Sequence, residues 1–150
     1  MDVAQEDVGD LKSYGFEDLE VGMQASHVKT ITADDIEVFA TLSGDNNPVH
    51  MSDDYAAATI FKERIAHGIL TASLISTVFG TKLPGPGSIY VSQSLNFRAP
   101  VKIGDHVVAS ARVTDLVEDR LRAVFACQCQ VNDKVVLDGE AVLYVPRRQA

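Results

Sequence analysis

The sequence predicts an α+β fold in which one antiparallel sheet wraps round a single central helix. Three observations support this prediction. Apolar and polar residues alternate from about residue 88 to residue 145, which is the period of β-strands. The stretch 65–81 is apolar on nearly every side, as expected of a helix that is buried on all sides. With 150 residues, the chain is long enough for one such domain with a real core.

The N-terminal part of the chain is expected to contain a leader, one strand and one helix. Residues 1–13 are acidic and almost free of periodic apolar residues, so we expect a flexible leader before a single domain at 14–150. A short strand is expected at 24–31. A helix should follow it, because Thr32 can cap the first turn and Gly44 can end the last one.

The segment 44–50 is the most unusual part of the sequence. Its Asn, Pro and Gly residues do not suit a continued helix or a central strand, so we expect a structured loop. A short helical turn is expected at 53–58, ahead of the buried helix.

Four long strands are expected in the second half of the chain, after a turn cluster at 83–87. They are placed at 88–98, 105–118, 120–131 and 134–145. Short connections, such as the turn at Asn132 and Asp133, favour antiparallel pairing. Only the apolar helix can cover one face of this sheet. A curled sheet wrapped round a central helix is the single hot-dog fold.

Charge and hydropathy argue against two classes of partner. The formal net charge of −8 disfavours nucleic acid, whose binding needs a concentrated cationic surface. No apolar stretch approaches the roughly 18 uncharged residues of a membrane helix, and the first residues lack the pattern of a signal peptide. We therefore expect a cytoplasmic protein without a membrane partner. Cys127 and Cys129 have no second Cys pair with which to form a zinc site, so they are expected to be buried free thiols.

Asp45 and His50 are the residues best suited to chemistry. They lie five positions apart across a turn stiffened by Pro48, which lets their side chains converge. A carboxylate and an imidazole that meet at one water can exchange a proton with it near neutral pH, as the hydration of an activated alkene requires. Which of the two takes the first proton is left open. Taken singly, each could instead be structural, Asp45 bonding its own turn and His50 bonding its surroundings.

A second element lies at the expected start of the buried helix, in the stretch 65–68. The first amides of a helix have no partner within it and lie at the positive end of its dipole. The amide of Gly68 can therefore hold a thioester oxygen as negative charge develops on it, and the missing Cβ permits close approach. The alternative is that Gly68 only avoids steric crowding at the start of the helix. His67 is expected to be a structural residue rather than a second base.

Three blocks of the sequence, at 42–53, 61–68 and 83–90, resemble the MaoC-like or hydratase 2 family, the (R)-specific enoyl-CoA hydratases. The last two are similar to its bacterial PhaJ type, which feeds polyhydroxyalkanoate synthesis. The similarity runs from about residue 14 to residue 145. It implies the hydration of trans-2-enoyl-CoA to (R)-3-hydroxyacyl-CoA without a metal or cofactor. It also implies a homodimer, in which each subunit is one hot-dog domain and each active site lies at the subunit interface.

The resemblance also assigns roles to residues. Asp45 and His50 are implied to be the catalytic pair, Gly68 the oxyanion donor, and Asn47 a residue that orients the loop or the water.

We expect Ser76 and Phe79 to line the acyl tunnel near its end, because they lie two to three turns past Gly68 on the central helix. The bulk of Phe79 then favours short or medium acyl chains.

Two other functions remain open from the sequence. One is a 3-hydroxyacyl-[acyl carrier protein] dehydratase, which runs the same chemistry in the other direction on a protein-bound substrate. The other is a non-catalytic hot-dog module that binds acyl thioesters, against which the intact pair of Asp45 and His50 argues. The net charge of −8, without a concentrated basic patch, disfavours docking of an acidic carrier protein. We therefore expect better turnover with the coenzyme A thioester.

Overall fold

The computed structural model of the chain describes residues 11–149. Most of the leader expected at 1–13 therefore lies outside the described residues. At its end, the hydroxyl of Ser13 donates a hydrogen bond to the carbonyl of Pro86 at 2.7 Å. No helix within the described range is long and apolar enough to cross a membrane.

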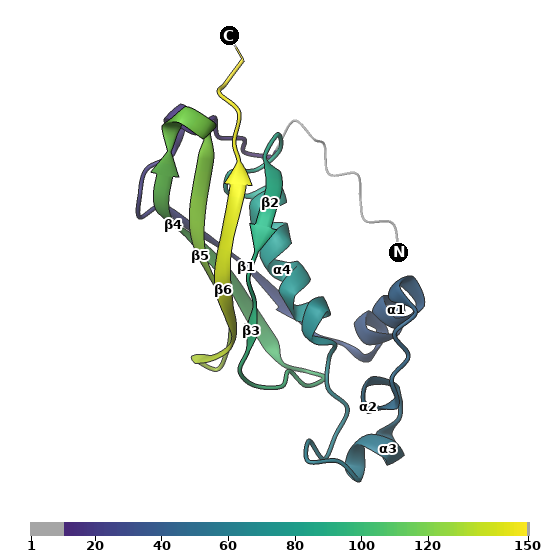
Figure 1. Cartoon of the computed structure of the whole chain (residues 1–150). Helices are drawn as coiled ribbons and strands as arrows, with labels where there is room; N and C mark the ends of the chain where they lie inside the picture. The colour runs from purple at the N-terminus through teal and green to yellow at the C-terminus, as the bar shows by residue number, and fades with distance from the viewer. Residues whose placement is uncertain (1–10, 150) are drawn as a thin grey trace.

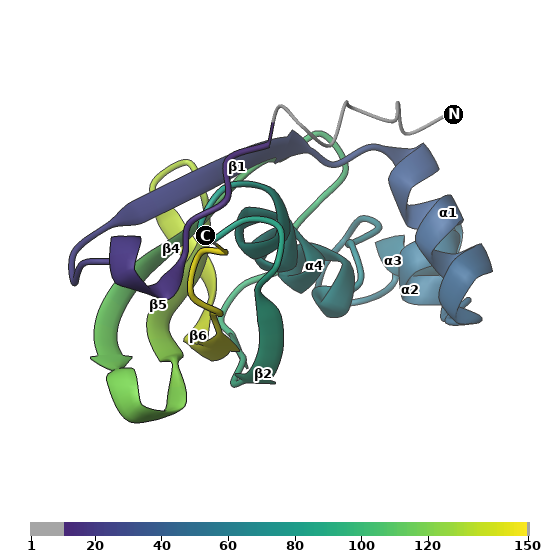
Figure 2. The same ribbon diagram turned by 90° about the horizontal axis from the view of Figure 1, so that it is seen from above.

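One antiparallel sheet of six strands curls round helix α4 (Gly68–Thr81), as Figures 1 and 2 show from two sides. The strands are β1 (Gln24–Thr30), β2 (Ile89–Gln93), β3 (Asn96–Phe97), β4 (His106–Val117), β5 (Arg122–Val131) and β6 (Lys134–Tyr144). Their order across the sheet is β1-β4-β5-β6-β2, with β3 also paired to β6. The predicted α+β architecture, the single hot-dog fold, is confirmed.

The core lies between α4 and the concave face of the sheet. Alternate residues of β4 and β5 point inward, which is why their burial repeats with a period of two. Phe79 of α4 packs its ring edge against Phe125 of β5, with ring centroids 4.8 Å apart. Cys127 and Cys129 lie in this core as free thiols, as the sequence predicted.

Helix α4 differs from the expected helix in two ways. It begins at Gly68 rather than at Ile65, because Ile65 forms a β-bridge with Lys102 and the Ala66 amide donates to the Val101 carbonyl at 2.7 Å. It is also not buried on all sides within one chain, since Ile69 is 56% exposed. The expectation of full burial was therefore wrong for the single chain.

The strand expected at 88–98 is split in two. The residues between β2 and β3 leave the regular ladder, and both the amide and the hydroxyl of Ser94 turn to the Glu140 carbonyl. The register also shifts between Tyr90 and Ser92, where one extra residue is accommodated. A pattern of alternating residues continues through such irregularities, so it could not reveal them.

Three short helices extend beyond one end of the sheet (Figure 1). They are α1 (Ala33–Ser43), α2 (Pro48–Met51) and α3 (Asp53–Ala57), and we call residues 33–64 the overhang. Helix α1 has the predicted ends: the Thr32 hydroxyl accepts from the Asp35 amide at 3.1 Å, and Gly44 adopts a φ of 83°.

Helix α2 corrects the expectation that 44–50 is a loop throughout. Its single turn begins at Pro48, whose fixed φ suits the first position of a helix and whose missing N–H is not needed there. The side chain of Asn47 accepts a hydrogen bond from the Val49 amide at 3.2 Å and so caps the turn.

Candidate active site

His50 lies on α2 with one ring nitrogen fixed by the backbone. Its Nδ1 lies 2.7 Å from the carbonyl oxygen of Ile65. Because a carbonyl oxygen only accepts, Nδ1 carries the hydrogen, and Nε2 of the uncharged ring is left as a proton acceptor. The guanidinium of Arg64 donates from Nε to the His50 carbonyl at 2.6 Å and is a second contact that holds this turn.

The surroundings of His50 favour the uncharged imidazole. Partial burial is the largest effect and lowers the pKa of His50 from its usual value of 6.5. The hydrogen bond to Ile65 and the charge of Asp45 raise the pKa of His50, whereas nearby His67 lowers it further. The net direction is downward, so the ring is ready to accept a proton at neutral pH.

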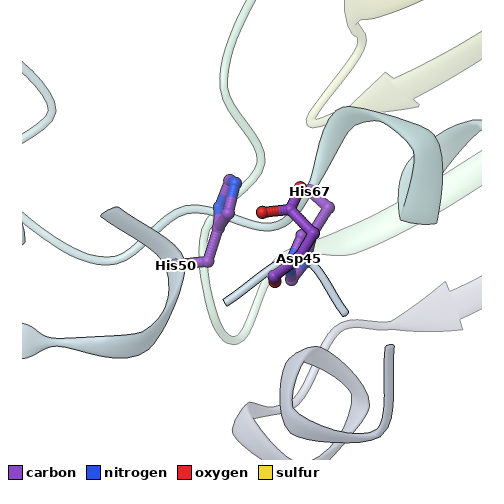
Figure 3. Close-up of side chains that lie close together, drawn as sticks. All are labelled: Asp45, His50 and His67. Carbon is purple, nitrogen blue, oxygen red and sulfur yellow. The ribbon is translucent and has the colours of Figure 1, made fainter. Parts of the chain in front are cut away.

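Asp45 follows the last residue of helix α1 and its Gly44 cap, and it is exposed. Its amide donates to the hydroxyl of Ser43 at 3.1 Å, and its carboxylate accepts from the amide of Asn47 at 3.2 Å. Figure 3 shows one of its carboxylate oxygens pointing toward the ring of His50. The turn thus brings the carboxylate and the imidazole to one place.

His67 completes this cluster through contacts that could not be recognised in the sequence. Its Nε2 lies 2.9 Å from the backbone carbonyl oxygen of Asp45, and its ring stacks on His50 with centroids 4.0 Å apart. One side-chain nitrogen or oxygen atom from each of Asp45, His50 and His67 lies within 4.8 Å of the other two.

This cluster has metal-ligating residue types, but its geometry suits a metal ion poorly. Ligand atoms of a tetrahedral zinc site lie about 3.3 Å apart, given Zn–N distances of about 2.0 Å. The rings of His50 and His67 are stacked with an interplanar angle of 29°, so their in-plane lone pairs do not converge on one point. One nitrogen of each ring is also taken by a backbone carbonyl.

A cavity of about 400 Å³ adjoins His50 and is also lined by Gly68, the first residue of α4. Most of its other walls are apolar, and they include Phe61, Phe97 and Leu137. A Cβ on Gly68 would lie 2.6 Å from a carbon of the Phe97 ring, so a side chain at this position would require the partly exposed Phe97 ring to shift. The start of the helix and the imidazole therefore open onto the same space.

The other predicted site residues do not line this cavity. Asn47 caps α2, and the described lining of the cavity does not include it or Asp45. Ser76 lines a second cavity of about 310 Å³, between α4 and β2. Phe79 is only 2% exposed and packs on Phe125 and Tyr90.

Comparison with known proteins gives consistent results. The model of the "MaoC like domain" family matches residues 18–134. A protein of Rhodospirillum rubrum named (R)-specific enoyl-CoA hydratase is 54% identical, over 93% of this chain and 96% of its own length. A 3-hydroxybutyryl-CoA dehydratase of Methylorubrum extorquens is 53% identical, over 93% of this chain and 89% of its own. The solved structure of R-hydratase PhaJ1 from Pseudomonas aeruginosa is similar with a TM-score of 0.88 and 42% identity, covering 92% of this chain and 89% of that one.

Proposed function

The chain belongs to the MaoC-like domain family, and from that premise we propose that it is an (R)-specific enoyl-CoA hydratase, a hydro-lyase acting on trans-2-enoyl-CoA. One observation carries the proposal. His50, with its acceptor nitrogen free and the carboxylate of Asp45 beside it, shares an apolar cavity with the N-terminus of a long helix at Gly68. An acid–base pair and an oxyanion donor are the groups that alkene hydration next to a thioester requires.

In the proposed mechanism, Nε2 of His50 takes a proton from a bound water as the water oxygen attacks C3. The bond between oxygen and C3 forms, an O–H bond breaks, and the electrons of the double bond move to the thioester oxygen. The Gly68 amide stabilises the resulting enolate oxygen, while the charge of Asp45 stabilises the imidazolium. The proton then passes from His50 to C2, and the thioester carbonyl re-forms. Because one group takes and returns the proton, both additions occur on one face.

The names of the two relatives describe opposite directions of the same reaction. A hydratase adds water to the enoyl thioester and a dehydratase removes it, and both names specify coenzyme A as the carrier. We infer that this chain also prefers the coenzyme A thioester. A comparison of kcat/KM for one acyl group on coenzyme A and on acyl carrier protein tests this, and a much higher value on the carrier protein would favour the dehydratase role.

The acyl tunnel past Ser76 and Phe79 stays a prediction. The cavity between α4 and β2 supports it for Ser76, which lines that space. Phe79 lies under Tyr90, which also lines that cavity, so a smaller residue at position 79 would deepen it. In a Phe79→Ala variant we expect the ratio of octenoyl-CoA to crotonyl-CoA turnover to rise, and an unchanged ratio would leave Phe79 as a core residue only. The cytoplasmic location and the supply of monomers to polyhydroxyalkanoate synthesis also stay predictions.

We further propose that two copies of the chain associate through β2 and the open face of α4. Strand β2 lies at one edge of the sheet, and Ile89, Tyr90 and Val91 are 58%, 41% and 50% exposed. It carries no charged residue, whereas the opposite edge strand, β1, carries Lys29, a residue that discourages strand pairing. Ile69 of α4 extends the apolar surface next to β2.

A matched pair of variants tests the proposed dimer. Val91→Lys places a charge on the β2 edge, and Val28→Lys places the same charge on β1, where Val28 is 60% exposed. Light scattering should show a dimer for the wild type and for Val28→Lys, and a monomer for Val91→Lys. A wild-type protein that is a fully active monomer would disprove this proposal.

The hydratase activity itself is tested with crotonyl-CoA. Loss of the absorbance of the enoyl thioester should accompany formation of 3-hydroxybutyryl-CoA, and a dehydrogenase specific for the (R) isomer should oxidise that product. A protein that binds crotonyl-CoA without turnover would instead be a thioester-binding module.

A further inference from the structure

His67 is one of only two polar or charged residues with nearly complete burial in the part of the chain that the structure describes, with 2% of its surface exposed. It directly precedes α4, and its ring contacts two other rings. The His50 ring stacks on it with centroids 4.0 Å apart, and the Phe39 ring packs at 4.7 Å with an interplanar angle of 50°. Its place among α1, α2 and α4 is therefore fixed by contacts with both rings.

The hydrogen bonding of His67 defines its tautomer. Nε2 donates to the Asp45 carbonyl at 2.9 Å, so in the uncharged ring Nδ1 carries no hydrogen. That Nδ1 atom is buried and has no hydrogen-bond partner among the described residues. Buried polar atoms without a partner are uncommon in folded proteins and call for an explanation. Nε2 is bonded to Asp45 and Nδ1 is buried, so neither nitrogen is placed to exchange a proton with a substrate.

The contact with His67 is the one that ties Asp45 to a distant part of the chain. Within the described region, the other hydrogen bonds of Asp45 are local, to Ser43 and to Asn47. These bonds shape the turn but do not fix its position relative to His50 and α4. The bond to His67 spans 22 positions of sequence and links the turn to the start of the helix that carries Gly68.

We propose that His67 is a positioning residue of the hydratase, which aligns Asp45 through its carbonyl and His50 through ring stacking. The inference rests on the proposed function. His67 does not touch the reacting atoms in this arrangement. It acts through the two residues that do, and it also joins them to the helix start at Gly68, so that one side chain sets the mutual geometry of all three groups.

Two contrasting variants separate the hydrogen bond from the stacking. His67→Gln keeps an N–H that can reach the Asp45 carbonyl but removes the ring. His67→Phe keeps a flat ring against His50 but removes the donor. His67→Ala removes both. His106→Gln, at an exposed histidine of β4 whose ring contacts Thr30 of β1, serves as the control.

With crotonyl-CoA, we expect His67→Ala to lower kcat about 10- to 100-fold, the scale of effect expected from misplacing catalytic groups by about 1 Å. KM should change little, because the walls of the cavity remain. His67→Gln and His67→Phe should each restore part of kcat, and His106→Gln should match the wild type. All rates are normalised to the folded fraction measured by circular dichroism. Variants with wild-type kcat per folded molecule, whatever their melting temperature, would show a purely structural role and overturn the proposal.

A measurement on the wild-type protein does not depend on whether a variant folds. Nitrogen NMR of ¹⁵N-histidine-labelled protein at about pH 7.5 should show His67 as the tautomer with hydrogen on Nε2. The opposite tautomer would remove the bond to Asp45 and overturn the proposal. The result is independent of the hydratase proposal, because a wild-type protein without turnover on crotonyl-CoA would disprove that function whatever the tautomer of His67.

Discussion

The overhang and the sheet body are held in shape by different interactions. In the described part of the chain, the overhang contributes only Ile36, Ala40 and Ala56 to the buried apolar residues. Some of its larger apolar side chains are largely exposed, Leu42 to 82% and Ile60 to 87%. Its turns are defined by hydrogen bonds, including the caps at Thr32, Gly44, Asn47 and Ser52.

The body is organised in the opposite way. Side chains from β4 and β5 pack on α4, and Phe125, Ile75 and Val113 are fully buried. Burial of apolar surface dominates stability, whereas hydrogen bonds fix geometry at a modest net gain. We therefore expect substitutions in the overhang to change catalysis more than stability, and substitutions in the body to do the reverse.

The largest effect is expected for the acid–base pair. Asp45→Asn and His50→Ala should each lower hydratase activity by about 10²–10⁴-fold, the usual range for losing a positioned acid or base. Asn keeps the size of Asp and an oxygen that can accept from Asn47, so the melting temperature should change little. Activity and thermal unfolding are measured on the same samples.

The double variant sharpens this test. If Asp45 and His50 serve one water, removing both should cost little more than removing either, since groups that act as a unit are not additive. A large fall in melting temperature with normal turnover of the folded protein would instead mean that both residues are structural.

The body should show the converse behaviour. Phe125→Ala removes a fully buried ring that packs against Phe79, and should lower the free energy of unfolding by about 3–5 kcal/mol. Turnover per folded molecule should stay close to wild type, because the ring lies away from the catalytic turn. Denaturant unfolding measures the first quantity and crotonyl-CoA turnover the second. Val38→Ala, at an exposed position of the overhang, is the control for stability.

Gly68 lies where the two regions meet, and its amide can be removed without removing the helix. Proline suits the first position of a helix, and the His67 backbone, with φ −58° and ψ 135°, is compatible with a following proline. Both Gly68→Pro and Gly68→Ala place a Cβ against Phe97, but only proline removes the N–H. We expect kcat of Gly68→Pro to be about 10²–10³-fold below that of Gly68→Ala, the effect of losing one oxyanion donor. Equal kcat in the two variants would exclude the Gly68 amide as that donor.

Much of the body could be predicted from the sequence because its signals are periodic and local. Alternation marked the long strands, and Thr32 and Gly44 marked both ends of α1. The start of α4 was placed at Ile65, too early by three residues, because apolar residues continue backwards into an extended segment that pairs with Val101 and Lys102. Such pairing depends on residues far along the chain.

The turn that carries Asp45 and His50, the proposed catalytic pair, was partly predictable for the same reason. Asp45 and His50 stood out through their spacing around Pro48, which is a local feature. The role proposed for His67 depends on a carbonyl 22 residues away and on ring stacking, and neither contact can be recognised in the sequence. Helix α2 was missed because Asn followed by Pro is typical both of turns and of the first turn of a helix.

The smallest expected effect links the overhang to pH. Burial lowers the pKa of His50 below 6.5 in the folded protein, so the unfolded chain binds more protons there as the pH falls below that value. Its contribution to stability is therefore complete above pH 6.5 and declines as the pH falls toward the folded pKa. The value of kcat/KM should fall around the folded pKa, as the acceptor nitrogen becomes protonated. Urea unfolding of the wild type and of His50→Gln at about pH 7.5 and 5.5 isolates the contribution of this side chain. Equal losses of stability in both proteins would mean that folding does not desolvate His50. The uncharged state of its ring at neutral pH would then need a cause other than burial.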